Sequence, residues 1–155
     1  MITTMRVLAV LLTCSIFALG QQQKSPSKTS QLRTVPTEAF GTFEGTQKSY
    51  VMYVGGYGVP MGQSTWKLHI KLNKIELFQY AGGDTYLYTG GYNVRKTEGS
   101  SSGELFCRLK ILKDGFADDF ETALSFHRDD QGSYSWVKPG GTNGEPEVIL
   151  KRTED

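Results

Sequence analysis

The strongest constraint on the fold is an alternation of apolar and polar side chains with a period of two. Residues 65–72 show it most clearly, with Trp66, Leu68, Ile70 and Leu72 apolar and Lys67, His69 and Lys71 polar between them. Successive side chains of a strand point to opposite faces, so the pattern predicts a strand with one buried face. Asn73 and Lys74 follow, and a second extended segment begins. Because Asn tolerates positive φ, this pair predicts the turn of a hairpin.

Similar extended segments recur along the chain, and turn residues rich in Gly, Asp and Pro separate them. We expect strands near Phe43 and at 50–54, 85–96, 104–112, 120–127, 133–138 and 147–152. About eight or nine short strands without a crossover helix predict an all-β, antiparallel up-and-down meander. A closed barrel is favoured over a sandwich, because short sequential connections allow closure and closure removes exposed edges.

One segment leaves an alternative open. Phe116, Phe120 and Leu124 recur every four residues, and Asp114 is a possible N-cap. Residues 115–123 are therefore either a short helix or part of a strand.

The N-terminal region divides into two segments. Residues 1–20 are typical of an export signal, with Arg6 before the apolar run 7–17 and small residues before Gln21. The apolar run is shorter than the roughly 20 residues that span a bilayer, so we expect a secreted or periplasmic protein without a membrane span. A lipid anchor on Cys14 is disfavoured, because no small residue precedes this cysteine. Residues 21–38 are polar and predict a flexible linker, which leaves 39–155 as a single β-barrel domain.

Charge and cysteine content narrow the class of protein. The chain has 155 residues, and without residues 1–20 it carries 16 basic and 16 acidic side chains. A net charge of zero argues against a nucleic-acid binder, which needs excess Lys and Arg to meet phosphate. Cys107 is then the one remaining cysteine, so no intrachain disulfide can form. It shares a strand face with Leu105, Leu109 and Ile111, which predicts a buried, unreactive thiol.

The segment Phe40-Gly41-Thr42-Phe43 opens the expected meander. A secreted chain of this length with such an opening resembles the lipocalin-like (calycin) barrels, whose usual opening is Gly-x-Trp; Phe43 stands in the place of the Trp. The resemblance covers residues 40–152 as a pattern of strands. It implies an eight-to-ten-stranded cup that takes a small apolar or amphipathic molecule in its mouth.

The sequence does not indicate an enzyme, a metal site or a cofactor. Gly99–Gly103 matches the G-x-S-x-G pattern of serine hydrolases, but it lies between two expected strands rather than before a helix. The Gly-rich segment 55–62 lacks the Lys-Ser/Thr pair of a phosphate loop. His69 and His127 have no Cys or His at zinc-ligand spacing.

Two sets of side chains are candidates for binding. The first is aromatic and suits the wall or rim of a ligand cup: Trp66, Tyr86, Tyr88, Tyr92 and Trp136. Ordinary cross-strand packing explains these aromatics equally simply, with the Gly90-Gly91 pair allowing a close approach of a neighbouring strand. The second set is a partner-contact loop, whose apolar members are Tyr57, Val59 and Met61.

These candidates correspond to two functions. The leading hypothesis is a non-catalytic binding protein for a small apolar or amphipathic ligand. The alternative is a protein-binding module, such as an enzyme inhibitor or immunity protein, that acts through the loops 55–62 and 139–146. A cup requires an enclosed apolar cavity, whereas a protein-binding module is compatible with a filled barrel and an exposed loop patch.

Overall fold

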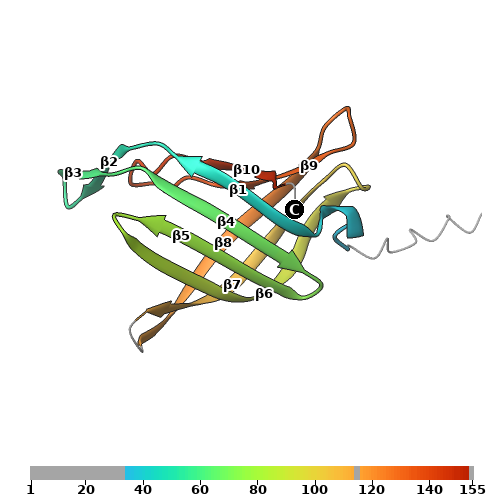
Figure 1. Ribbon diagram of the computed structural model, residues 1–155, viewed down its shortest axis with the longest axis horizontal. Helices are drawn as coiled ribbons and strands as arrows, with labels where there is room; N and C mark the ends of the chain where they lie inside the picture. Colours follow the sequence, from blue (N-terminus) through green and yellow to red (C-terminus); the bar gives the residue numbers. More distant parts are fainter. Residues whose placement is uncertain (1–33, 114–115, 154–155) are drawn as a thin grey trace, which may run out of the picture. The chain divides into compact units, whose positions relative to one another are not determined.

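The computed structural model describes residues 34–113 and 116–153. These residues form a turn of 3₁₀ helix and ten strands (Figure 1): η1 (Thr37–Ala39), β1 (Gly41–Gln47), β2 (Tyr50–Val54), β3 (Tyr57–Met61), β4 (Ser64–Lys71), β5 (Lys74–Ala81), β6 (Asp84–Glu98), β7 (Ser102–Lys113), β8 (Phe116–Arg128), β9 (Tyr134–Lys138) and β10 (Val148–Arg152). The expected export signal, including Cys14, and linker residues 21–33 lie outside the described residues.

Eight of the strands close into an antiparallel barrel, which confirms the predicted fold class. The strand order is β1-β10-β9-β8-β7-β6-β5-β4, and β1 pairs with β4 to close the ring. Strands β2 and β3 form a separate two-stranded sheet between β1 and β4 in the sequence. This β2–β3 hairpin extends beyond one end of the barrel (Figure 1).

The predicted alternation places apolar side chains inside the barrel. In β4 every second residue from Ser64 to Ile70 is buried, and the residues between them are only partly buried. Cys107 is buried among Leu105, Leu109 and other core residues, as predicted. Desolvation by burial raises the pKa of its thiol to about 12, so the thiol is neutral at physiological pH.

One end of the barrel is closed by the chain that precedes β1. Val35 and Ala39 are buried in the core, so packing begins a few residues before the domain start expected at Ala39. The indole Nε1 of Trp136 donates to the carbonyl oxygen of Ala39 at 3.1 Å. The guanidinium of Arg152 lies over the Phe43 ring and donates to the Glu38 and Phe40 carbonyl oxygens. We call this end the closed end.

Three local expectations can be compared with the structure. Asn73 has φ 59°, which confirms the predicted hairpin, but its turn consists of Leu72 and Asn73 rather than Asn73 and Lys74; Leu72, expected on the buried face, is therefore exposed. The segment 55–62 was expected to be a loop, but residues 57–61 form β3; this expectation was wrong because Gly58 and Pro60 are tolerated in a short edge strand. The helix alternative for 115–123 is also wrong, because β8 covers 116–128. A spacing of four fits a period of two as well, and Phe120 and Leu124 both pack on the core from one strand.

Candidate functional site

The aromatic residues predicted to line a cup pack within the barrel. The Trp66 and Tyr88 rings are stacked with centroids 5.9 Å apart, and Tyr88 lies 4.9 Å from the Phe120 ring. Tyr86 is partly buried against the same core. Burial is the main cause that raises the pKa of Tyr88, whose hydroxyl donates to Gln79 Oε1 at 3.0 Å. These rings fill the interior near the end of the barrel from which the β2–β3 hairpin extends.

The other two candidates lie toward the closed end. Trp136 is fully buried, and its ring packs against Phe43 and Phe126 with centroids 6.3 and 5.3 Å away. Tyr92 is partly buried, and its hydroxyl donates to the Lys71 carbonyl oxygen at 3.2 Å. The five aromatics therefore span the length of the core and do not gather around one opening.

The Gly90-Gly91 pair admits a neighbouring strand. A Cβ at Gly90 would collide with the carbonyl oxygen of Arg108 on β7. The missing side chain at Gly90 thus allows close approach of the β7 backbone, the role in cross-strand packing that the sequence suggests for this pair.

The β2–β3 hairpin carries more than half of the exposed large apolar side chains of the described residues. Its cross-strand pairs place Tyr50 opposite Met61 and Met52 opposite Val59 on one face, and Val51 opposite Pro60 on the other. Of nine strongly exposed large apolar side chains, five lie here: Val51, Tyr53, Val54, Tyr57 and Val59. Tyr57 at the tip is 80% exposed. No charged residue occurs between Lys48 and Lys67, so both faces of the hairpin are apolar.

The hairpin contacts the segment between β9 and β10. The backbone N–H of Tyr53 donates to the carbonyl oxygen of Asn143 at 2.8 Å. A Cβ at Gly144 would lie only 2.7 Å from the Val51 carbonyl oxygen, which shows how closely the two backbones approach. The structure therefore places residues 143–144 of one predicted contact segment against β2, and β2 pairs with residues 57–61 of the other. We call β2, β3, residues 139–147 and the adjoining mouth of the barrel, where β1 and β9 end and β4 begins, the hairpin end.

A buried polar network holds this end in place. Lys138 is 3% exposed, and its ammonium donates to Glu145 Oε1 at 2.7 Å and lies 4.7 Å from the Trp66 ring centroid. The Gln47 amide nitrogen donates to Glu145 Oε1 and to the Pro146 carbonyl oxygen. Its amide oxygen accepts from the Ser64 hydroxyl and the Trp66 indole. Charged and polar partners thus tie β1, β4 and β9 to the 139–147 segment.

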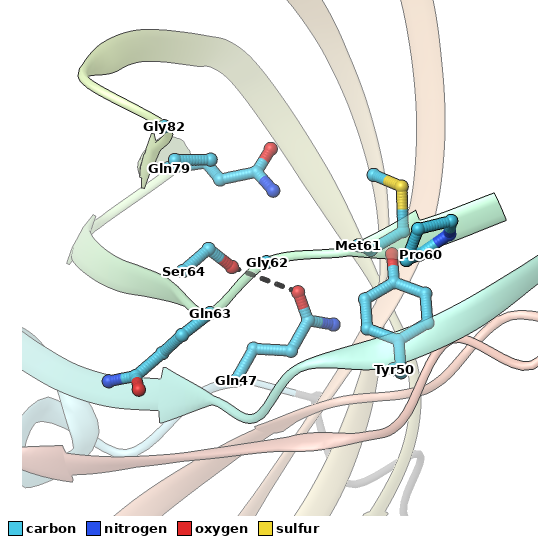
Figure 2. A pocket seen from close by; sticks show the side chains of 10 residues that line it. Gln47, Tyr50, Pro60, Met61, Gly62, Gln63, Ser64, Gln79 and Gly82 are labelled. Carbon is cyan, nitrogen blue, oxygen red and sulfur yellow. Dashed lines mark hydrogen bonds between the residues drawn. The ribbon is translucent and has the colours of Figure 1, made fainter.

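A pocket of about 240 Å³ lies between the hairpin and the mouth of the barrel (Figure 2). Its lining comprises Gln47, Tyr50, Pro60, Met61, Gly62, Gln63, Ser64, Gln79, Ala81 and Gly82. The pKa of the Tyr50 hydroxyl is raised, mainly by burial and further by the nearby Glu145 carboxylate. Of the sequence candidates, only Met61 lines this pocket.

The polar residues of the hairpin end were not predicted from the sequence, and Gln47 shows the reason. Gln47 follows Phe43 and Gly45 at the spacing of two that marks the inward face of β1. A polar residue at such a position was a usable signal of a buried hydrogen-bond network. Two of its four partners, however, Glu145 and Pro146, lie 98 and 99 residues away, and no local pattern contains these contacts.

Neither the protein-family models nor the curated proteins compared with this chain match it. In the described part of the chain, no helix is both long and apolar enough to cross a membrane. Within residues 34–113 and 116–153, His, Cys, Asp and Glu side chains form no group of three that could hold a metal ion.

Proposed function

We propose that this chain is an exported, non-catalytic binding protein that contacts a partner protein through its hairpin end. One observation carries the proposal: β2 contacts residues 143–144 on one side and pairs with residues 57–61 on the other, and the hairpin exposes five large apolar side chains. Contiguous exposed apolar surface is unfavourable in water and marks interaction sites in soluble proteins. The Tyr-rich composition fits a protein interface, because Tyr contributes a large contact area and a polar tip.

The shape of the hairpin indicates the shape of the partner. Beyond the pocket, the tip exposes Tyr57 and Val59 on one face and Tyr53 on the other, so docking one face on a flat surface would leave the other in water. Insertion into a cleft buries both faces at once. We therefore propose a partner with an apolar cleft, which agrees with the inhibitor class of function. The filled barrel supports this hypothesis over an enclosed cup.

Site-specific crosslinking tests the proposal. A photoreactive phenylalanine analogue at Tyr57 should crosslink one protein in an extract of the native host, and excess unlabelled chain should compete. The same analogue at Leu72 is the matched control, since this residue is 73% exposed at the closed end. Unlabelled Y57S/V59S protein should compete poorly. Equal crosslinking from both positions, or full competition by the double variant, would contradict the proposal.

A small-ligand function remains a second candidate, favoured by the pocket at the mouth of the barrel. Membership of the lipocalin-like family belongs to this candidate, because the closed eight-stranded antiparallel barrel is of that kind. The ligand would bind beside the filled barrel, against Tyr50 and Met61, rather than inside it. Native mass spectrometry of protein purified from its host tests it: a bound small molecule supports this candidate, and a stoichiometric protein supports the first.

A further inference from the structure

The pocket beside the barrel mouth has a lining without charge. All ten residues that line it are neutral at physiological pH, and several carry amide or hydroxyl groups. A charged ligand would lose hydration in this half-enclosed space without gaining an ionic partner from the lining. The pocket chemistry therefore selects a neutral ligand.

The hydrogen bonds of the pocket show which polar atoms remain for a ligand. The Gln47 amide is fully used, because its oxygen accepts two bonds and its nitrogen donates two. The Gln79 oxygen accepts from Tyr88, but among the described residues its amide nitrogen has no hydrogen-bond partner. The Ser64 hydroxyl donates to Gln47 and keeps acceptor capacity. Figure 2 shows Gln79 above Ser64, and Tyr50 farther along the pocket beside Pro60 and Met61.

The remaining lining is apolar and partly aromatic. Tyr50 and Met61 face each other across the two strands of the hairpin, and Pro60 lies next to Met61. An aromatic ring beside neutral amide and hydroxyl groups suits a molecule with both C–H faces and hydroxyl edges. The volume of about 240 Å³ lies below the usual range of pockets for drug-sized ligands, so it fits one ring rather than a whole lipid.

We propose that this pocket binds a neutral sugar ring, with Tyr50 against the ring face and the Gln79 amide nitrogen donating to a hydroxyl. The inference rests on the small-ligand candidate and names its ligand class. The sugar belongs either to a free saccharide or to a glycolipid, which share this chemistry.

Saturation-transfer NMR and calorimetry on the full chain test the proposal. The probes are the methyl glycosides of glucose, galactose, mannose and N-acetylglucosamine, together with octyl β-glucoside below its micelle concentration. At least one methyl glycoside should bind. Y50A should weaken this binding by about tenfold. Y53A is the matched control on the opposite face of the same strand and should leave binding unchanged. Q79E keeps an acceptor for Tyr88, removes the donor and should weaken binding by about fivefold.

The other probes separate the outcomes. Equal affinity for methyl and octyl β-glucoside supports a free saccharide, whereas tighter binding of the octyl glycoside that remains sensitive to Q79E supports a glycolipid. Binding of the octyl compound alone, insensitive to Q79E, overturns the sugar inference. Binding of the neutral dye N-phenyl-1-naphthylamine without any glycoside overturns it too, but leaves the small-ligand candidate standing. Absence of binding by every probe overturns both. Circular dichroism of each variant verifies that the barrel is folded.

Discussion

The two ends of the barrel are built on opposite principles. At the closed end, apolar side chains such as Val35 and Trp136 are inside, and hydrogen bonds to backbone carbonyls secure the covering segment. At the hairpin end, the buried positions also include the polar Gln47 and Lys138, and five apolar side chains of β2 and β3 are exposed. The closed end minimises exposed apolar area, as folding alone would require. Burying polar groups and exposing apolar ones, as the hairpin end does, contributes little to stability. This is the physical reason for assigning binding to the hairpin end.

The largest effect should come from truncating the closed end. W136A removes a fully buried ring that contacts Phe43 and Phe126 and deletes the hydrogen bond to Ala39. We expect a loss of about 3–5 kcal/mol in the free energy of unfolding, measured by urea denaturation. Y57A at the hairpin tip should change it by less than about 0.5 kcal/mol, because this side chain is exposed. Similar losses at both ends would remove the contrast between them.

A smaller effect is expected for the buried ion pair of the hairpin end. K138M should lower the free energy of unfolding by about 2 kcal/mol, because the Glu145 carboxylate loses its cationic partner while remaining only partly exposed. Replacing both partners removes the unpaired charge, so K138M/E145Q should be more stable than the sum of the two single changes predicts. A double-mutant cycle in urea measures this coupling. Additive single effects would show that the pair does not hold the 139–147 segment.

Most strands of the barrel could be predicted from the sequence, whereas most contacts of the hairpin end could not. The alternation in 65–72 and the turn at Asn73 are local properties, and both predicted elements formed. Strand β3 was missed because Gly58 and Pro60 oppose strand formation locally, and its pairing with β2 compensates. Composition alone singled out Tyr57, Val59 and Met61. Their surroundings depend on contacts between Gln47 and residues near 145, which only the closed barrel creates.

The pH dependence of stability probes the dry interior between the two ends. Burial raises the pKa of the Cys107 thiol from 9.0 to about 12, so the folded state holds the neutral thiol over a pH range in which the unfolded chain releases the proton. This contribution is complete below pH 9 and is lost as the pH rises toward 12.

The difference between two chains isolates the thiol. From pH 8 to pH 10, the wild-type chain should lose about 1 kcal/mol more stability than C107A, because the buried Tyr88 is common to both and cancels. Urea unfolding at both pH values measures the difference, in chains carrying C14S so that no second thiol titrates. Equal pH dependence in the two chains would show that water reaches Cys107.

The smallest expected effects concern two turn residues, one at each end of the barrel, that share the same left-handed backbone conformation. Asn73 in the β4–β5 turn has φ 59°, and Gly55 in the β2–β3 turn has φ 57°. Alanine in this left-handed region costs about 1 kcal/mol at either position. N73A should show the full cost, because its turn joins two strands of the closed barrel and unfolds only with it. G55A should lower the free energy of global unfolding by less than about 0.5 kcal/mol, because a two-stranded sheet is marginally stable alone and opens locally. The strain at Gly55 should appear instead as faster amide exchange confined to 50–61. If G55A instead lowered the free energy of global unfolding by the whole cost of about 1 kcal/mol, the hairpin and the barrel would unfold as one unit. The hairpin would then be part of the folding core rather than a separate binding element.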